Sequence, residues 1–380
     1  MFDRTSPNRG TADRGRAIIL SVSRAPLVTL LLAFAGIGTA CTSFKDNNTA
    51  PTDGGADSGS VSDTSSVGDT SSISDTRPEG DDASPECDAS TCGIETLFST
   101  LFQGGTLTVD DTNVYVEDQG TTTGEVYQCP KTGCANPIAL GPGYATGIAT
   151  DAKYVYWNDF SGGTIQRCTI GGCQNAPTVV APNQPHAEGL SFDGANLYWA
   201  ATGSILTCAS PACTSPSLLA SGQSTLIVGT SAETSTVYWI SSGSILDCAA
   251  TGCGGHPVTV TSSVTASPNG NGVVIKDGFA YYTSGNAVVS CPVTSTCAFP
   301  QTIGTSSAPF GLASDGSNVY WLDVNIAKVY VCPVTGCVGG AEVFADQTSF
   351  DPAGEIGANV ALDGEYAYWA DPVAVYRKHK

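Results

Sequence analysis

The chain has few basic residues, and this shortage excludes two classes of partner. Lys and Arg number 15 against 35 Asp and Glu, so the 380 residues carry a formal charge of −20 at pH 7. Nucleic-acid binding needs clustered Lys and Arg that release counterions from phosphates, and anionic lipid attracts the same residues. The acidic composition therefore argues against nucleic acid and against direct docking on an anionic membrane surface.

Histidine is also scarce, which limits the catalytic chemistry that the sequence supports. The three histidines are His186, His256 and His379, and no Gly-x-Ser-x-Gly motif accompanies them. Nucleophilic catalysis needs a nucleophile beside a positioned base, and fourteen of the 15 cysteines fall in close pairs, so we expect few titrating thiols. The sequence therefore predicts no catalytic residue.

The one apolar stretch near the start is short and interrupted. Residues 25–40 contain Pro26, Thr29 and Thr39, and fall short of the ~18 uninterrupted apolar residues of a spanning helix. Five arginines precede the stretch: Arg4, Arg9, Arg14, Arg16 and Arg24. This order of basic and apolar segments is typical of an export signal, and it places the rest of the chain outside the cytoplasm.

The end of the apolar stretch indicates a lipid anchor. Gly38-Thr39-Ala40-Cys41 resembles a bacterial lipobox, although Gly38 stands where lipoboxes usually carry Leu. We predict that residues 1–40 are a lipoprotein-type signal peptide and that Cys41 is the lipidation site. A plain cleaved signal and a retained anchor remain alternatives.

Residues 41–86 have the composition of a disordered tether. Ser, Thr, Asp and Gly dominate, and a hexamer related to Ser-Val-Ser-Asp-Thr-Ser recurs from Ser60. So few apolar groups cannot offset the entropy of ordering the chain. A flexible segment of this length spans about 35–40 Å. The spaced aspartates lack the Gly-punctuated pattern of a calcium repeat, so we interpret them as solvated spacer.

Seven cysteine pairs recur along the rest of the chain at intervals of 39 to 43 residues. Six are Cys-x-x-x-x-Cys, and one has an additional intervening residue. The pairs are Cys87–Cys92, Cys129–Cys134, Cys168–Cys173, Cys208–Cys213, Cys248–Cys253, Cys291–Cys297 and Cys332–Cys337. Structural zinc sites prefer Cys-x-x-Cys pairs that meet at one metal. In an exported chain, local disulfides are the favoured interpretation.

A second marker, an aromatic dipeptide, recurs in step with the cysteines. It stands at Tyr115-Val116, Tyr156-Trp157, Tyr198-Trp199, Tyr238-Trp239, Tyr281-Tyr282, Tyr320-Trp321 and Tyr368-Trp369. Each unit of about 41 residues divides into four short alternating strands separated by Gly, Asp, Ser and Pro turns. A single four-stranded sheet buries neither face, so the units must stack radially. We therefore predict an all-β fold, a β-propeller over residues 87–380.

The two ends of this region suggest how the ring closes. The last unit has three predicted strands and no cysteine pair, whereas an unpartnered segment beginning at Ile94 follows Cys92. Docking that N-terminal segment as the fourth strand of the last blade removes the open sheet edges. This latch gives seven blades, with six blades as the alternative. The predicted disulfides fall at the turn between the third and fourth strand of each blade.

The repeat resembles a known family. Val155-Tyr-Trp-Asn-Asp159 followed by Gly163-Thr-Ile is similar to the YWTD repeat of low-density-lipoprotein-receptor-type propellers. The chain departs from that family in its seven blades and its cysteine pairs. It also lacks the motif's acid in three copies, where Ala201, Ser241 and Ser284 stand. The resemblance implies the fold alone. The chain also resembles propeller lipoproteins of unknown role from soil bacteria with large genomes.

The polar residues divide between turns and one rim of the ring. We expect the motif aromatics to pack between sheets, rather than to form a stacking surface for sugars. We expect five recurrent aspartates to be turn formers: Asp110, Asp151, Asp193, Asp315 and Asp363. Loops before the innermost strands and after the Tyr-Trp strands should share one rim. That rim would collect Asp118, Asp159, His186, Glu188, Asn271, Asp323, Glu355 and Asp371.

These features predict an envelope-anchored, secreted propeller that acts as a binding or interaction module. The ligand would be an unknown protein or glycan, with membrane contact only through the N-terminal lipid. The alternatives are a structural envelope component and a lactonase-like hydrolase that uses a divalent cation at the channel mouth. The weak metal candidates are Asp159, Glu188, Asn271, Asp323, Glu355 and Asp371. We expect no cofactor, and we place the protein in the bacterial cell envelope, at the outer membrane, with the side left open.

Overall fold

The computed structural model describes residues 93–99, 103–120, 123–213, 215–223, 228–233, 235–266, 272–326, 328–346, 359–372 and 374–380. The chain divides into two units, residues 1–80 and 81–380, and every described residue belongs to the second. The predicted signal peptide, Cys41, the tether and the Cys87–Cys92 pair lie outside the described residues. The described ranges contain 28 strands and no helix. They therefore contain no helix that is long and apolar enough to cross a membrane.

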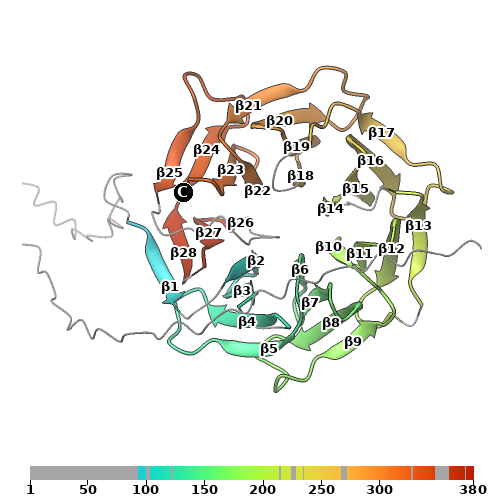
Figure 1. Ribbon diagram of the computed structural model, residues 1–380, viewed down its shortest axis with the longest axis vertical. Helices are drawn as coiled ribbons and strands as arrows, with labels where there is room; N and C mark the ends of the chain where they lie inside the picture. Colours follow the sequence, from blue (N-terminus) through green and yellow to red (C-terminus); the bar gives the residue numbers. More distant parts are fainter. Residues whose placement is uncertain are drawn as a thin grey trace, which may run out of the picture. The chain divides into compact units, whose positions relative to one another are not determined.

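The strands form seven four-stranded antiparallel sheets arranged as a ring (Figure 1). Blade 1 comprises β2 (Gly104–Val109), β3 (Asn113–Asp118), β4 (Glu125–Pro130) and β5 (Ile138–Pro142). Blade 2 comprises β6 (Ile148–Thr150), β7 (Tyr154–Asp159), β8 (Thr164–Thr169) and β9 (Thr178–Ala181). Blade 3 comprises β10 (Glu188–Phe192), β11 (Asn196–Ala201), β12 (Ser204–Ala209) and β13 (Ser217–Ser221). Blade 4 comprises β14 (Val228–Glu233), β15 (Thr236–Ser241), β16 (Ser244–Ala249) and β17 (Val258–Thr261).

The remaining three blades complete the ring. Blade 5 comprises β18 (Val273–Lys276), β19 (Phe279–Ser284), β20 (Ala287–Pro292) and β21 (Gln301–Thr305). Blade 6 comprises β22 (Pro309–Ser314), β23 (Asn318–Asp323), β24 (Lys328–Pro333) and β25 (Glu342–Asp346). Blade 7 comprises β26 (Val360–Leu362), β27 (Tyr366–Ala370), β28 (Ala374–His379) and the N-terminal strand β1 (Glu95–Ser99).

The N-terminal latch is confirmed, and the ring has seven blades, not six. Strand β1 pairs antiparallel with β28, with Glu95 opposite Arg377, and it forms the outer strand of the last blade. The Arg377 guanidinium also donates to the Glu95 carboxylate, with Nη2 to Oε2 at 2.7 Å. The first strands of successive blades lie around the centre and contact one another all the way round (Figure 1). The closure therefore joins residues from opposite ends of the propeller region.

The aromatic dipeptide builds the interfaces between blades. Successive side chains on a strand point to opposite faces, so the tyrosine and the tryptophan of one blade serve two different interfaces. Tyr156 of blade 2 packs with Trp199 of blade 3, and Tyr198 of blade 3 packs with Trp239 of blade 4. Each of the seven interfaces has its own apolar cluster of this kind. All five tryptophans are fully buried, which confirms that these rings pack between sheets.

Six disulfides lie at the turns between the third and fourth strands, as predicted. They join Cys129–Cys134, Cys168–Cys173, Cys208–Cys213, Cys248–Cys253, Cys291–Cys297 and Cys332–Cys337, with Cα atoms 5.2 to 5.9 Å apart.

In three of the six pairs the N–H of the second cysteine also bonds the blade before it. The Cys297 N–H donates to Val260 O at 2.8 Å, and the Cys337 N–H donates to Ile303 O at 2.9 Å. Val260 and Ile303 lie on the outer strands of the preceding blades. These cysteine turns therefore hold neighbouring sheets together in addition to closing their own hairpins.

Candidate functional site

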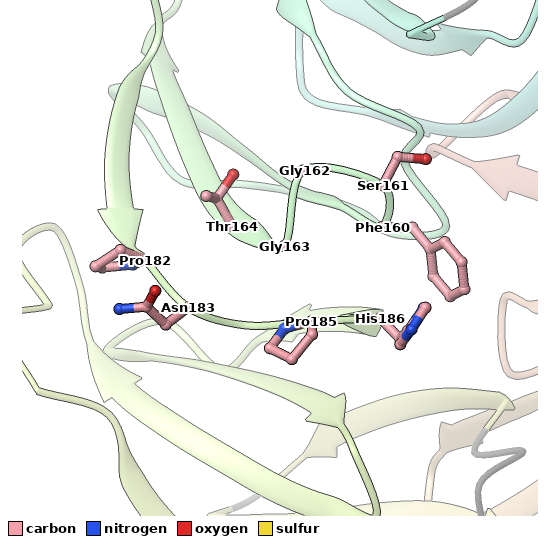
Figure 2. Close-up of a pocket in the computed structure, with 9 residues that line it drawn as sticks. All are labelled: Phe160, Ser161, Gly162, Gly163, Thr164, Pro182, Asn183, Pro185 and His186. Atoms are coloured by element: carbon pink, nitrogen blue, oxygen red, sulfur yellow. The ribbon is translucent and has the colours of Figure 1, made fainter.

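A hollow of about 580 Å³ opens between two surface segments of blades 2 and 3. One wall is the β7–β8 turn, residues 160–163 with Thr164, and the other is the loop from β9 to β10, residues 182–186 (Figure 2). We call it the blade-2 hollow. Its lining residues are Phe160, Ser161, Gly162, Gly163, Thr164, Pro182, Asn183, Pro185 and His186.

The first wall exists because the β7–β8 turn is long. Asp159 pairs with Thr164 across four turn residues, whereas Ala201 pairs with Ser204 in blade 3 across only two. The Asp159 carboxylate holds the longer turn by accepting the Gly162 N–H at 2.8 Å, and the Asp159 carbonyl accepts the Gly163 N–H at 2.8 Å. The longer turn contributes Phe160 and Ser161 to the lining.

The second wall is anchored by one buried side chain. The Gln184 Oε1 atom accepts the Trp199 indole N–H at 2.9 Å, and the Gln184 backbone N–H donates to Gly163 O at 2.7 Å. These two bonds fix the loop to blade 3 and to the opposite wall. Asn183 and His186, on either side, have left-handed φ values of 59° and 54°. Such values are uncommon for residues other than glycine, and they often occur at functional sites.

The lining combines an aromatic pair with uncharged polar groups. The Phe160 and His186 rings lie 4.9 Å apart between centroids, tilted by 59° (Figure 2). The Ser161 and Asn183 side chains have no hydrogen-bond partner within the described ranges, and both residues are exposed. The nine residues include no Asp, Glu, Lys or Arg. The hollow therefore offers a ring surface and free hydrogen-bonding groups, and its lining residues carry no carboxylate, ammonium or guanidinium group.

Two of the predicted rim residues lie next to this hollow. Asp159 immediately precedes the first wall and is engaged in its own turn. Glu188 begins β10, two residues after His186, and burial raises the pKa of its half-buried carboxyl to about 7. The structure thus brings Asp159, His186 and Glu188 into one region, although only His186 lines the hollow.

The other predicted rim acids are structural or lie outside the described residues. Asp323 is fully buried and accepts the backbone N–H groups of Ser307 and Ala308 at 2.6 and 3.1 Å. Asp371 is fully buried and accepts the Ala374 N–H at 2.8 Å. Asp118 accepts the Gly120 N–H at 2.8 Å.

Asn271 and Glu355 lie outside the described residues. Across the ranges that the structure describes, no group of three or more His, Cys, Asp or Glu side chains is arranged to hold a metal ion.

Turn length accounts for three of the four copies of the motif's acid. Asp118, Asp159 and Asp323 each end a strand that enters a turn of four or more residues, and a carboxylate oxygen accepts a backbone N–H within that turn. The three copies without the acid pair Ala201 with Ser204, Ser241 with Ser244, and Ser284 with Ala287, across two residues. A two-residue hairpin leaves few free N–H groups to satisfy. In these three copies the acid is present where a long turn needs it. In the fourth copy, Asp371 stands only three residues before Ala374, and the two residues exchange hydrogen bonds.

The recurrent turn aspartates are turn formers, as predicted, with one partner that the sequence analysis missed. Asp193 Oδ1 accepts the N–H groups of Ala195 and Asn196 at 2.9 and 2.7 Å, while its Oδ2 accepts the Tyr198 hydroxyl at 2.6 Å. Burial acts to raise the pKa of Asp193, but these bonds outweigh it and hold the pKa below its usual range. The same tyrosine bond occurs from Tyr115, Tyr156 and Tyr368. The constant spacing of five residues between aspartate and tyrosine was the available signal.

A second missed residue is Glu117, which lies between blades 1 and 2. It is fully buried, and neither carboxyl oxygen has a hydrogen-bond partner within the described ranges. Burial raises the pKa of Glu117 to about 9, and the nearby Gln119 amide and Ala145 backbone offset only part of this effect. A Cβ atom at Gly105 would lie 1.7 Å from Glu117 Oε2, so only glycine leaves room for the carboxyl. Burial therefore favours the protonated form of the Glu117 carboxyl.

Comparison with known proteins identifies the fold and no family. No protein-family model matches the chain, and no curated protein matches it. A streptogramin B lyase structure has a TM-score of 0.61 and 10% identity, over 76% of this chain and 97% of that chain. Virginiamycin B lyase from Staphylococcus aureus has a TM-score of 0.59 and 12% identity, over 75% and 97%. At this identity the likeness shows the propeller fold alone.

Two further structures place the resemblance in context. The Pan2 WD40 domain of Neurospora crassa has a TM-score of 0.57 and 8% identity, over 75% of this chain and 95% of that chain. A chain of a nidogen/laminin complex has 17% identity over 56% of this chain and 87% of that chain, but its TM-score of 0.46 is too low to support a structural conclusion. The propeller fold is confirmed, and the closer resemblance to the YWTD family stays a prediction. A propeller is consistent with a binding or interaction module, and it hosts many functions.

Proposed function

We propose that the protein is an exported binding module that presents the blade-2 hollow to a ligand. The observation that carries this proposal is the preformed hollow itself. Its walls are joined by the bond from Gln184 N–H to Gly163 O, and its lining holds unpartnered polar side chains beside a ring pair. Rigid loops lose little freedom when a ligand binds, so a site of this kind is ready for recognition.

Binding fits the hollow better than catalysis does. A histidine that acts as a general base needs a nucleophile or substrate proton within hydrogen-bonding reach and a partner that orients its ring. The His186 ring instead packs against Phe160, and in the described part of the chain it bonds no hydroxyl or carboxylate. Asp159, the nearest predicted acid, is used by the turn that it caps.

We further propose that this module is held at the bacterial envelope by a lipid on Cys41. Residues 1–40 would direct export, and residues 41–86 would give the propeller a reach of about 35–40 Å from the membrane. The six disulfides support an oxidising compartment. Metabolic labelling with a palmitate analogue tests the anchor. Label should enter the intact chain and be absent from a Cys41→Ala variant, and equal labelling of both would refute it.

The binding function is tested by screening the full chain, purified under oxidising conditions, against arrays of glycans and peptides. Phe160→Ala removes the aromatic wall, and Phe299→Ala is the matched control because Phe299 is 93% exposed on the turn of blade 5. We expect at least one ligand that the wild type and Phe299→Ala bind equally and that Phe160→Ala binds about tenfold more weakly. Ligands that bind all three proteins equally would place the binding face elsewhere.

A further inference from the structure

We propose that the blade-2 hollow recognises a short, uncharged saccharide. This proposal rests on the proposed function, because it names the ligand class of the same site. Four features of the hollow favour such a ligand: its uncharged lining, its ring surface, its free polar groups and its anchored backbone. All four concern residues 160–164 and 182–186.

The lining excludes ligands that depend on charge. None of the nine residues is Asp, Glu, Lys or Arg. A phosphate or carboxylate ligand would find no guanidinium or ammonium partner, and burying an unpaired ion is costly. The nearest acid along the loop, Glu188, would repel an anion further when it is ionised. An uncharged ligand fits this environment.

The ring pair gives the hollow one flat apolar side. Phe160 is half-buried and His186 is exposed, and their centroids lie 4.9 Å apart. In Figure 2 both rings stand at the same end of the hollow. A sugar ring carries a C–H face that is apolar and of similar size, so it can cover an aromatic face while its hydroxyls point elsewhere.

The polar side chains of the lining suit hydroxyls: Ser161 lies beside Phe160, and Asn183 lies at the end away from the rings (Figure 2). The Asn183 amide offers two donors and an acceptor, and the Ser161 hydroxyl offers one donor and two acceptor sites. Neither side chain is engaged within the described ranges. Thr164 Oγ1 already accepts the Gln166 amide at 3.1 Å, which leaves its own proton free to donate. Neighbouring sugar hydroxyls act as donor and acceptor at once and match this mixture.

The backbone that carries these groups is held in place before a ligand arrives. Asn183 and His186 keep left-handed backbone angles on either side of Gln184, whose side chain is bonded to Trp199. On the opposite wall, the Phe160 N–H donates to Tyr144 O at 3.0 Å. A weak ligand with few contacts gains most from such preorganisation.

A peptide is the less suitable ligand for this hollow. Extended peptides commonly bind by adding a strand to an exposed sheet edge. Eight of the nine lining residues lie in a turn or a loop, and only Thr164 belongs to a strand. The volume of about 580 Å³ is within the range of small-molecule sites, typically about 300–1,000 Å³. Peptide binding is therefore an outcome of the test and not part of the proposal.

The test is saturation-transfer NMR on the full chain with matched sugars. The probes are glucose, galactose, N-acetylglucosamine and their β-linked disaccharides, with glucose 6-phosphate as the charged counterpart of glucose. We expect transfer to at least one neutral sugar with a dissociation constant of about 1 mM, and none to glucose 6-phosphate. Asn183→Gly and His186→Asn each remove one lining group while tolerating the left-handed backbone. Each should weaken binding about fivefold to tenfold, whereas Phe299→Ala should not.

The outcomes separate this proposal from the broader one. Loss of sugar binding in Asn183→Gly and His186→Asn supports the saccharide site. Absence of transfer to every neutral sugar overturns it, and so does equal binding by wild type and both variants. The proposed function survives the first of these results if the array screen finds a peptide whose binding depends on Phe160. It fails together with the saccharide proposal if no ligand of either class depends on the hollow.

Discussion

The buried carboxyl of Glu117 makes the stability of this propeller depend on pH in a predictable direction. Its pKa is raised from 4.5 to about 9 in the folded protein. In the unfolded chain the carboxyl ionises near pH 4.5, so above that pH folding must bind a proton. The contribution of Glu117 to stability is thus fully present below pH 4.5 and is lost as the pH rises toward 9.

The size of the effect follows from the width of this window. Each pH unit between the two pKa values lowers the free energy of unfolding by about 1.4 kcal/mol. At pH 7 the loss relative to pH 4.5 is about 3 kcal/mol, a large part of the ~5–15 kcal/mol typical of a domain. Glu117→Gln has nearly the same shape and cannot ionise. The variant should therefore gain stability relative to wild type as the pH rises.

The assay is urea unfolding of the full, oxidised chain at about pH 5, 7 and 8.5, followed by fluorescence of the five buried tryptophans. Glu342→Gln is the control for losing one negative charge, because Glu342 is exposed on β25. We expect the curves of wild type and Glu117→Gln to diverge by about 4 kcal/mol between pH 5 and 8.5, and those of wild type and Glu342→Gln to run in parallel. Parallel curves for Glu117→Gln would refute the buried, protonated carboxyl.

Three other perturbations probe the contacts between and within blades by urea unfolding. Replacing Cys332 and Cys337 with alanine opens one turn and should lower the free energy of unfolding by about 2 kcal/mol or more; no change would mean that the bridge is dispensable. Lys378→Met removes the ammonium that donates to the outer strand of blade 6 and should lower the free energy of unfolding by about 1 kcal/mol. An unchanged free energy of unfolding would mean that this contact does not stabilise the ring. Tyr198→Phe removes the bond to Asp193 and should cost about 1–2 kcal/mol at pH 7. Because the pKa of Asp193 is lowered by folding, that cost should shrink as the pH falls below the usual range of an aspartate, and an equal cost at about pH 3 would contradict the pairing.

The repeat made the fold predictable, because each recurrent residue type has one structural task. The adjacent Tyr and Trp point to opposite faces, so each blade carries half of two interfaces, as Tyr156 and Trp157 do. The cysteine spacing marks the third turn of each blade, and the unpartnered segment at Ile94 marks the latch. These signals are local and periodic, and periodicity survives in a single sequence.

The candidate site was only partly predictable, since it depends on a departure from the repeat. His186 was placed on the rim from its position before an innermost strand, but Phe160, Ser161 and Asn183 were not singled out. The available signal was the length of the turn after Asp159, which is two residues longer than the turn after Ala201. The left-handed backbone at Asn183 and the bond from Gln184 to Trp199 arise from contact between two blades and leave no pattern in the sequence. Glu117 was missed for the same reason, because its burial depends on the neighbouring sheet.

The last blade shows what the cysteine turns contribute to the ring. Lys378 lies opposite Ala367 on β27. The equivalent position in blade 1 is Cys129, which lies opposite Val114 on β3. Its ammonium donates to Phe344 O at 2.7 Å, on the outer strand of blade 6.

At the equivalent carbonyls of three other interfaces the donor is a cysteine N–H, as between Cys134 and Leu97 at 3.1 Å and between Cys337 and Ile303 at 2.9 Å. These outer-strand carbonyls thus accept a hydrogen bond from the next blade, whether or not that blade's own turn carries a disulfide. A lone N–H on a flexible turn would lose entropy in meeting that carbonyl, whereas a turn closed by a disulfide is already ordered. At the three interfaces with a cysteine N–H donor, the bridge therefore stabilises the ring by holding that donor in place, and Lys378 meets the same need in the blade whose outer strand comes from the other end of the propeller.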